Sequence, residues 1–437
     1  MTPPAFWHPA GPQWGNGSGF STDPCKGAPV SDRSVTEPLG RPFWTLWSAF
    51  SATNLADGLS LVALPLLAIR LTGDARLIAA VTAFQYLPFL VIGLPAGTII
   101  DRFDRRWIAV IAQTGRAIVM AALGLALLSG RPPIGWLFLV AFLIGCAEVL
   151  TDGGLPAIVR DLVRNDQLEV ANARMMATQR VTNAFVGPPL GAALFGLDDS
   201  IPFLVSAAIT AVGILALIRI PGSHRPANDD ERGSLRVDMQ VGLRFVWGHP
   251  VLRPLVVAVA MFSFVGAALN ATSVVLMKER FGLSDLGYGL ILSLDAVVAV
   301  ITSFFVAGLI RRTSHGFSQQ VSVVCFTVAS FLLGFTTVAA VAFVAVAING
   351  IADPTWNIVS ATVRQRLVPD QVFGRMMTAY LFIAWGMRPA GAFLGGVIAE
   401  EAGPEWVMIL AGTVVGSLLI TARSLFSRVD AAMAEAD

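Results

Sequence analysis

The stretch GTIIDRFDRR, residues 97–106, overlaps the end of one apolar run, 77–100, and directly precedes another, 107–128. About 20 apolar residues in a helix are enough to span a bilayer. Five of the ten residues in the stretch are charged, and charged side chains are costly to place in hydrocarbon. The pattern therefore predicts two transmembrane helices joined by a short charged loop at a membrane surface.

The composition of the whole chain agrees with this interpretation. The 437 residues are 55% hydrophobic and only 14% charged, whereas soluble domains carry about 25% charge. The mean hydropathy is +0.69, which predicts an all-α membrane protein and leaves little room for a separate soluble enzyme domain. The net charge of +1 gives no electrostatic indication of nucleic-acid binding.

Twelve apolar stretches of helical length recur along the chain, in two groups of six. A polar, partly amphipathic linker at 221–250 separates an N-terminal half (43–220) from a C-terminal half (251–428). We expect residues 1–42 to be a disordered tail because they are rich in Pro, Gly and Ser, and 429–437 to be a second tail. The predicted helices are 44–69, 77–100, 107–128, 135–158, 172–196, 201–220, 252–275, 286–310, 317–337, 339–361, 376–398 and 405–425.

The positions of the basic residues predict the orientation. With both termini on the cytoplasmic side, 22 of the 30 Lys and Arg residues fall inside and 5 outside, and the other three lie within helices. Basic residues are retained on the cytoplasmic side of membranes. We therefore expect a multi-pass protein of the inner (plasma) membrane with both termini in the cytoplasm.

An internal repeat supports the division into halves. AIVRDLVRNDQLEVANARMMA (157–177) resembles ATVRQRLVPDQVFGRMMTA (361–379), with Arg160 opposite Arg364 and Arg174 opposite Arg375. Repeated six-helix halves are typical of transporters that bind their substrate near the midplane between the halves.

The charged loop resembles the signature G-x-x-x-D-R-x-x-R-R of the major facilitator superfamily, and the twelve-helix plan agrees with it over about 42–428. The resemblance implies two pseudo-symmetric six-helix halves and a conformational latch at this loop. We expect the glycine to permit close helix approach, and the arginines to tie the loop to helix ends such as Asp161. The latch residues are Gly97, Asp101, Arg102, Arg105 and Arg106. The alternative is a basic loop without a switching role.

Within the superfamily, NLADGLSLVALPLLAIRLTG (54–73) and GLRFVWGHPVLRPL (242–255) resemble the enterobactin-exporter and macrolide-efflux branch. Gly187, Pro188 and Gly191 match the core of the helix 5 motif of exporters, G-x-x-x-G-P-x-x-G-G, while Asn183 and Ala192 replace its outer glycines. The partial match favours export. The alternative is a helix kink with close packing.

Ionisable residues within the predicted helices are the candidate sites for substrate or coupling protons. In the family fold, helices 1, 4, 7 and 10 line the central cavity, so Asp57, Glu148 and Asp353 form the preferred set. Asp57 is the first choice for proton coupling because helix 1 has no basic residue near its middle. The other candidates are Asp152, Asp295, Arg116, Arg180 and Arg388. For any one acid, the alternative is a structural salt bridge to one of these arginines.

Other chemistry has little support in the sequence. The chain has no Walker-type G-x-x-x-x-G-K-[ST] motif, which disfavours ATP-driven transport. Its four histidines, including His224, have no metal-ligand spacing and are expected to be solvated; we expect no metal and no cofactor. Among the aromatic residues, Trp356 and Trp385 are the best candidates to contact a flat substrate.

Together these patterns predict a monomeric secondary transporter that exports a small amphipathic compound, such as a drug, a macrolide or a siderophore-like molecule, in exchange for protons. Its partners would be the substrate, protons and the lipid bilayer. One alternative is an importer or lipid transporter of the same fold. Another is a membrane sensor that transports nothing.

Overall fold

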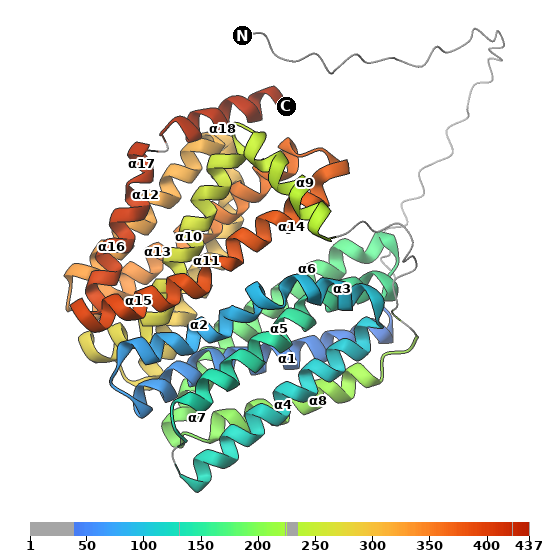
Figure 1. Cartoon of the computed structure of the whole chain (residues 1–437), viewed down its shortest axis with the longest axis vertical. Helices are drawn as coiled ribbons and strands as arrows, with labels where there is room; N and C mark the ends of the chain where they lie inside the picture. The colour runs from blue at the N-terminus through green and yellow to red at the C-terminus, as the bar shows by residue number, and fades with distance from the viewer. Residues whose placement is uncertain (1–38, 131, 223, 225–234, 422, 437) are drawn as a thin grey trace, which may run out of the picture. The chain divides into compact units, whose positions relative to one another are not determined.

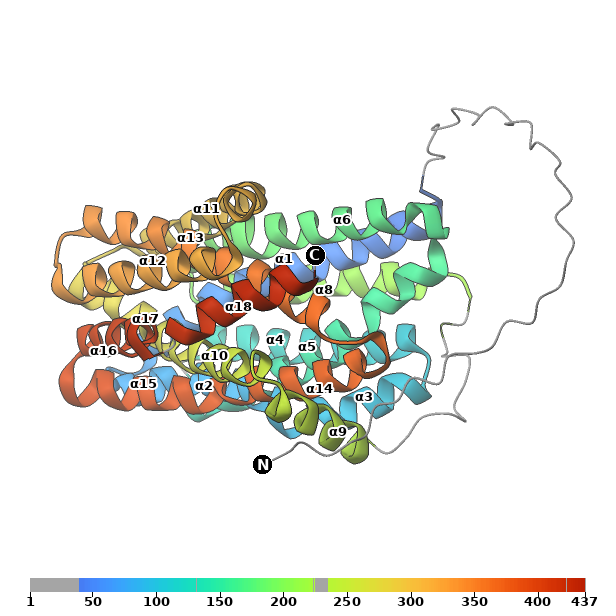
Figure 2. The same ribbon diagram turned by 90° about the horizontal axis from the view of Figure 1, so that it is seen from above.

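The computed structural model describes residues 39–436, apart from 131, 223, 225–234 and 422. The described residues are almost entirely helical and form no strand. In Figures 1 and 2 the long helices of both halves run alongside one another. The expected N-terminal tail falls mostly on residues 1–38, which lie outside the described part.

Six membrane-spanning segments make up the N-terminal half. The second and fifth consist of more than one helix, and the fifth contains a π-helical turn, η2, directly before Gly187-Pro188. The segments are α1 (Arg41–Leu71); α2 (Ala75–Val91) with α3 (Gly93–Arg102); α4 (Arg105–Ser129); α5 (Gly135–Leu162); α6 (Leu168–Gln179), η2 (Arg180–Val186) and α7 (Gly187–Leu197); and α8 (Ile201–Ile218). A short 3₁₀ turn, η1 (Asn165–Gln167), precedes α6.

The C-terminal half repeats the plan with six further segments. They are α10 (Leu252–Val275) with the π-helical turn η3 (Leu276–Arg280); α11 (Asp285–Arg312); α12 (His315–Phe335); α13 (Ala339–Leu367); α14 (Asp370–Gly386) with α15 (Arg388–Ala402); and α16 (Pro404–Gly416) with α17 (Leu418–Thr421). Within the described residues, ten segments are long and apolar enough to cross a membrane by themselves. Counting α2–α3 and α6–α7 as one segment each gives twelve, so the expected fold is confirmed.

Large apolar side chains remain exposed on the outside of the helices. Phe304 is 80% exposed, Phe305 70% and Ile111 69%. A water-soluble protein rarely exposes so many large apolar groups together, whereas lipid tails solvate them. The exposed apolar surface thus agrees with the composition in placing the helices in a bilayer.

Two helices lie outside the twelve segments. The linker contains α9 (Leu235–Gly248), which packs on α14. The C-terminal residues form α18 (Arg423–Ala436), where the sequence suggested a tail after 428; its Phe426 and Val429 are buried. The Asp430 carboxylate accepts hydrogen bonds from the Gly316 amide (2.7 Å) and the Ser314 hydroxyl (2.9 Å) at the start of α12, which explains why this end is ordered (Figure 1).

Small residues bring α1 and α7 into direct backbone contact. A Cβ added at Gly58 would lie 2.5 Å from the Asn183 carbonyl oxygen and 2.8 Å from the Gly187 Cα, and one added at Gly191 would lie 2.7 Å from the Leu59 carbonyl oxygen. Close approach of this kind is a common way to pack membrane helices. The GPPLG stretch therefore serves at least the packing role that the sequence offered as the alternative to an exporter motif.

We expect Gly58→Ala to destabilise the protein, because the new methyl group meets backbone atoms that cannot move aside. The cost of overpacking is about 1–3 kcal/mol, which should lower the midpoint of thermal unfolding in detergent by several degrees. Gly115→Ala in α4 is the matched control, since nothing lies within 4 Å of its added Cβ. Equal midpoints for the two variants would contradict close α1–α7 packing.

Candidate functional site

A cavity of about 400 Å³ lies within the C-terminal half. Its wall comes mainly from α10, α11, α12 and α13; α15 contributes Arg388 and α16 contributes Met408. Among the described lining residues, Tyr86 of α2 is the one contribution from the N-terminal half. The volume falls in the range of small-molecule sites, about 300–1,000 Å³.

Polar residues reach this cavity from one face of α13. Asn349, Asp353 and Asn357 recur at intervals of four, which places them on the same side of a helix. The Asn357 side chain donates a hydrogen bond to Asp353 Oδ1 (2.9 Å). The N-x-x-x-D-x-x-x-N spacing was present in the sequence, but the two asparagines were not singled out because they carry no charge.

The second carboxylate of the cavity belongs to Asp295 of α11. Asn349 donates a hydrogen bond to its Oδ1 (3.0 Å). Gly350 permits this contact, because a Cβ there would lie 2.9 Å from the Asp295 carbonyl oxygen and 2.8 Å from Val298 Cβ. The glycine thus lets α11 and α13 approach closely enough for the two polar groups to meet.

No basic side chain forms an ion pair with either carboxylate in the described part of the chain. Arg388 lines the cavity, but its guanidinium lies 4.0 Å from the Trp385 ring centroid and 5.2 Å from that of Tyr86. Arg180 of η2 and Arg388 interact with Asp353 only electrostatically, beyond the 4 Å of a salt bridge. Asp295 and Asp353 therefore lack a cationic partner of their own.

Aromatic rings form another part of the wall. The Phe262 ring centroid lies 4.3 Å from that of Trp356 and 5.5 Å from that of Phe326. Trp356 is therefore placed where a substrate could contact it. Trp385 instead stacks on Phe89 of α2, with 4.4 Å between the centroids, and joins the two halves.

The N-terminal half contains a separate cluster of buried charges. Arg116 of α4 is 1% exposed and forms an ion pair with Asp57 of α1. On α5, Glu148 accepts a hydrogen bond from the Gln85 side chain (3.2 Å), and Asp152 lies one turn further on. Both acids interact electrostatically with Arg116 but form no ion pair with it in the described structure. One arginine is therefore shared among three acids.

The structure removes the argument for preferring Asp57. Helix 1 has no basic residue near its middle, but α4 supplies Arg116 from the neighbouring segment, and the pair matches the structural alternative considered for each acid. Removal of one partner of a buried pair leaves an uncompensated charge. Asp57 thus has the geometry expected of an acid that holds helices together.

The charged loop after α3 is only partly described, since the Asp101 side chain lies outside the described residues. A Cβ on Gly97 would meet nothing within 4 Å, so the close approach expected there is not present, and Arg102 is exposed. The Asp104 side chain caps α4 by accepting from the Arg106 amide (2.9 Å). The Arg106 side chain donates to the Ile220 carbonyl at the end of the half.

His224 at the start of the linker is buried, contrary to expectation. It is 3% exposed, and its Nδ1 lies 2.9 Å from Asp161 Oδ2. Its amide donates to Asp104 Oδ2 (3.1 Å), and its carbonyl accepts from the Arg105 amide (3.4 Å). Asp161 was expected to bind the loop arginines, but its carboxylate contacts His224 instead. A lone histidine in a polar linker gives no sequence signal for this contact.

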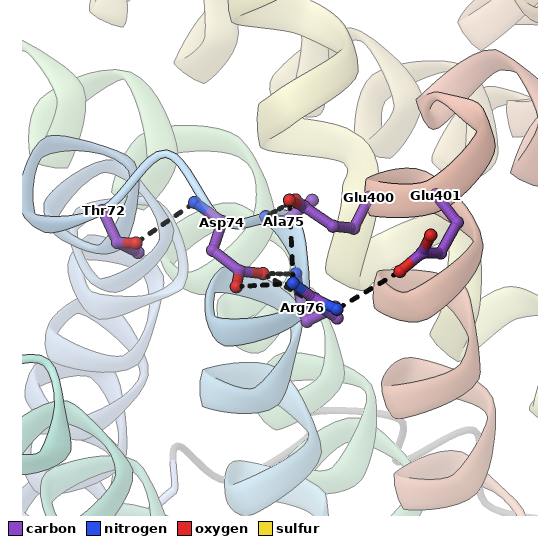
Figure 3. A network of polar contacts seen from close by, with 6 residues as sticks. All are labelled: Thr72, Asp74, Ala75, Arg76, Glu400 and Glu401. Carbon is purple, nitrogen blue, oxygen red and sulfur yellow. Dashed lines mark hydrogen bonds and ion pairs between the residues drawn. The ribbon is translucent and has the colours of Figure 1, made fainter.

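Ion pairs join the two halves at the end of the bundle that contains the α1–α2 turn (72–74), which we call the α1–α2 end. Arg76 at the start of α2 contacts Glu401 (3.2 Å) and Glu400 (3.9 Å) at the end of α15 (Figure 3). The Glu400 carboxylate also accepts from the Ala75 amide (2.7 Å). The Arg76 side chain donates to Asp74 and lowers the pKa of that carboxyl, so Asp74 stays ionised across physiological pH.

A second group of charges lies at the same end. Arg70 of α1 pairs with Asp199 in its own half and with Asp285 at the start of α11 (2.8 Å). Lys278 also reaches Asp285 (2.6 Å). We call the Arg70 and Arg76 contacts to the C-terminal half the clamp.

Two packed six-helix halves with a cavity that contains carboxylates form an arrangement typical of membrane transporters. The sequence profile of the Major Facilitator Superfamily matches residues 46–391. The chain therefore belongs to this superfamily.

Several similar proteins are named as efflux proteins. The chain is similar to macrolide efflux protein A of Streptococcus pyogenes, with 21% identity over 390 residues that cover 85% of this chain and 93% of that protein. It is also similar to the multidrug efflux pump Tap of Mycobacterium tuberculosis (strain ATCC 25618 / H37Rv), with 26% identity over 392 residues, 83% of this chain and 88% of that one.

Solved structures with the same fold include the nucleoside transporter NupG, with a TM-score of 0.73, 14% identity and coverage of 89% of this chain and 99% of that chain. A bacterial homologue of the iron transporter ferroportin in an inward-facing state has a TM-score of 0.69 and 16% identity, with coverage of 90% and 100%. At these identities the similarity shows the fold alone.

We expect Arg76→Gln to loosen the clamp, because it removes the contacts of α2 with Glu400 and Glu401. Exposed ion pairs contribute little to stability, so the loss of both pairs should raise the population of separated halves only modestly. Distances between spin labels on the first turn of α2 and the last turn of α15 measure this population.

The control is Arg164→Gln, which removes an exposed pair with Asp166 within one half. A distance distribution that is the same in Arg76→Gln as in the unmodified protein would show that the clamp does not hold this end.

Proposed function

We propose that the protein is a proton-coupled exporter of a small amphipathic compound that works by alternating access between the two halves. The observation that carries this proposal is the pair of carboxylates, Asp295 and Asp353, that face a drug-sized cavity without a basic partner. Its similarity to efflux proteins over more than four fifths of the chain supports export as the direction.

Substrate and proton would bind in different halves. The cavity of the C-terminal half offers room, aromatic surface and free carboxylate oxygens, as a substrate requires. The cluster around Arg116 would bind the proton, because one arginine cannot neutralise the negative charges of Asp57, Glu148 and Asp152 together. A proton on one of these acids would reduce the excess negative charge.

Of the three acids first considered, Glu148 is now the preferred proton carrier. Asp57 is held by Arg116, and Asp353 belongs to the cavity. Glu148 is half-buried, has the neutral Gln85 as its hydrogen-bond partner and has Asp152 one turn away. Burial disfavours a carboxylate that has no cation beside it, so a change in hydration during the cycle can load and release a proton.

The clamp and the charged loop would control opposite ends of the same motion. We propose that the α1–α2 end faces the outside and that the α3–α4 end, with both termini, faces the cytoplasm, since the loops there hold most of the basic residues. Opening to the outside would then require the clamp to separate. Asp101 and Arg105 would act as the latch at the cytoplasmic end and influence turnover more than substrate affinity.

Reporter fusions test the orientation. A reporter fused after residue 436 should report the cytoplasm, whereas one inserted at Gly403, in the α15–α16 turn, should report the outside. The first site follows α18 and the second lies beside the clamp, so the two signals should be opposite. Signals from the same side would contradict the topology.

Substitution of single acids tests the coupling. Glu148→Gln should insert normally and exchange substrate across vesicle membranes, yet lose export driven by a pH gradient, because the glutamine cannot carry the proton. Asp57→Asn should instead lower thermal stability, because it leaves Arg116 buried without its partner, at a cost of about 3–5 kcal/mol. Asp353→Asn should weaken substrate binding itself.

The matched control for these measurements is Asp166→Asn, which removes a negative charge from an exposed turn between α5 and α6. If Glu148→Gln, Asp57→Asn and Asp353→Asn, singly and combined, all retained full gradient-driven export, proton coupling through these acids would be excluded. Gradient-driven uptake in place of export would favour an importer of the same fold.

A further inference from the structure

We propose that the cavity of the C-terminal half binds an amphipathic organic molecule with a single positive charge, placed between Asp295 and Asp353. The proposal deepens the function proposed above by naming the substrate class, and it rests on that function only for the statement that the bound molecule is exported. The binding site itself is argued from the charge balance, the free hydrogen-bond acceptors and the aromatic wall of the cavity.

The charge balance of the cavity favours a cation. Its lining includes two carboxylates, Asp295 and Asp353, and one guanidinium, that of Arg388. The guanidinium lies against the Trp385 and Tyr86 rings and forms no ion pair with either acid in the described structure. An unpaired charge within a membrane-spanning bundle is costly. A ligand cation between the acids would supply the missing partner.

The hydrogen bonds leave one oxygen of each acid available. Asn349 donates to Asp295 Oδ1 and Asn357 donates to Asp353 Oδ1. Among the described residues, neither Oδ2 atom accepts a hydrogen bond. The asparagines thus fix the orientation of both carboxylates and satisfy only half of their acceptors, as expected of a site arranged for a ligand.

The two carboxylates also act on one another. They interact electrostatically with like sign, so a cation shared by both gains attraction from each and relieves their repulsion. The Arg180 guanidinium approaches from η2 of the N-terminal half and interacts with both acids, but at more than salt-bridge distance. It moderates the negative potential without occupying the site.

The rest of the wall suits an apolar body attached to that charge. Phe262, Trp356 and Phe326 form a connected aromatic surface in the same cavity as the acids. Aromatic faces attract cations as well as apolar groups. A cavity of about 400 Å³ accepts a compact drug-sized molecule, and an anion of the same size would meet the unpaired carboxylates.

Equilibrium binding of tetraphenylphosphonium to the full-length protein in detergent tests the proposal without any gradient. We expect saturable binding of one ion per chain. Methyltriphenylphosphonium should displace it, whereas triphenylphosphine oxide, a neutral molecule of nearly the same shape and the same number of non-hydrogen atoms, should not. This comparison separates the effect of charge from that of shape and apolar surface.

Variants locate the site. Asp353→Asn and Asp295→Asn should each weaken tetraphenylphosphonium binding by about tenfold or more, and the double variant should abolish it. Asp353→Glu should restore most of the affinity, which shows that the asparagine variant fails for lack of charge and not for lack of fold. Asp166→Asn, with the same change of charge far from the cavity, should bind as the unmodified protein does.

Each result of these binding experiments either supports the proposed cation site or overturns it. Three results would overturn the proposal: no saturable binding, equal displacement by the neutral oxide, or unchanged binding in the Asp295→Asn, Asp353→Asn double variant. This holds even if gradient-driven export were observed with some other compound. Charge-dependent binding lost in the aspartate variants supports the site even if vesicles show no export, and in that case the proposed function fails while the binding site stands.

Discussion

The need to pair every charge inside the membrane is the constraint on which this structure depends. Arg116 is almost completely buried, and its ion pair with Asp57 links α4 to α1. Because Arg116 is paired with Asp57, Glu148 and Asp152 have only weaker interactions with it. In the described part of the C-terminal half, no arginine forms an ion pair with Asp295 or Asp353. Asp57 is thus fully paired, whereas the acids of α5 and the acids of the cavity have no ion-pair partner in the described structure. Acids without such a partner are the ones that can exchange a proton or a ligand with the surroundings.

The sequence predicted the fold well because the signal was local. Each membrane-spanning segment carries its own apolar run, so twelve crossings and the central linker could be located from hydropathy. Segment ends were less accurate: α1 begins at Arg41 and ends at Leu71, beyond the apolar run, because polar end residues continue the helix. The last residues were missed because α18 is amphipathic and is ordered by contacts with α12, including the Asp430 cap.

The candidate site was only partly predictable. The apolar runs identified eight ionisable residues within the predicted helices, but their pairing depends on how the packed helices are rotated, which sequence periodicity does not give. Asp57 was preferred for the lack of a basic neighbour along its own helix, and the neighbour came from α4. The location of the cavity within one half, with Tyr86 as the contribution of the other half, likewise depends on packing. His224 was missed because its partners, Asp104 and Asp161, are distant in sequence.

The clamp has a consequence for the medium around the protein. Its contacts join side chains that are partly exposed: Arg76 is 44% exposed and Glu401 68%. Dissolved ions screen such pairs, with a Debye length of about 8 Å at physiological ionic strength and about 3 Å at 1 M. In the proposed orientation the clamp lies at the outer surface, so the salt content of the outer medium would set the strength of these pairs. A rise in the salinity outside the cell would then weaken the contact between the two halves with no change in substrate or expression.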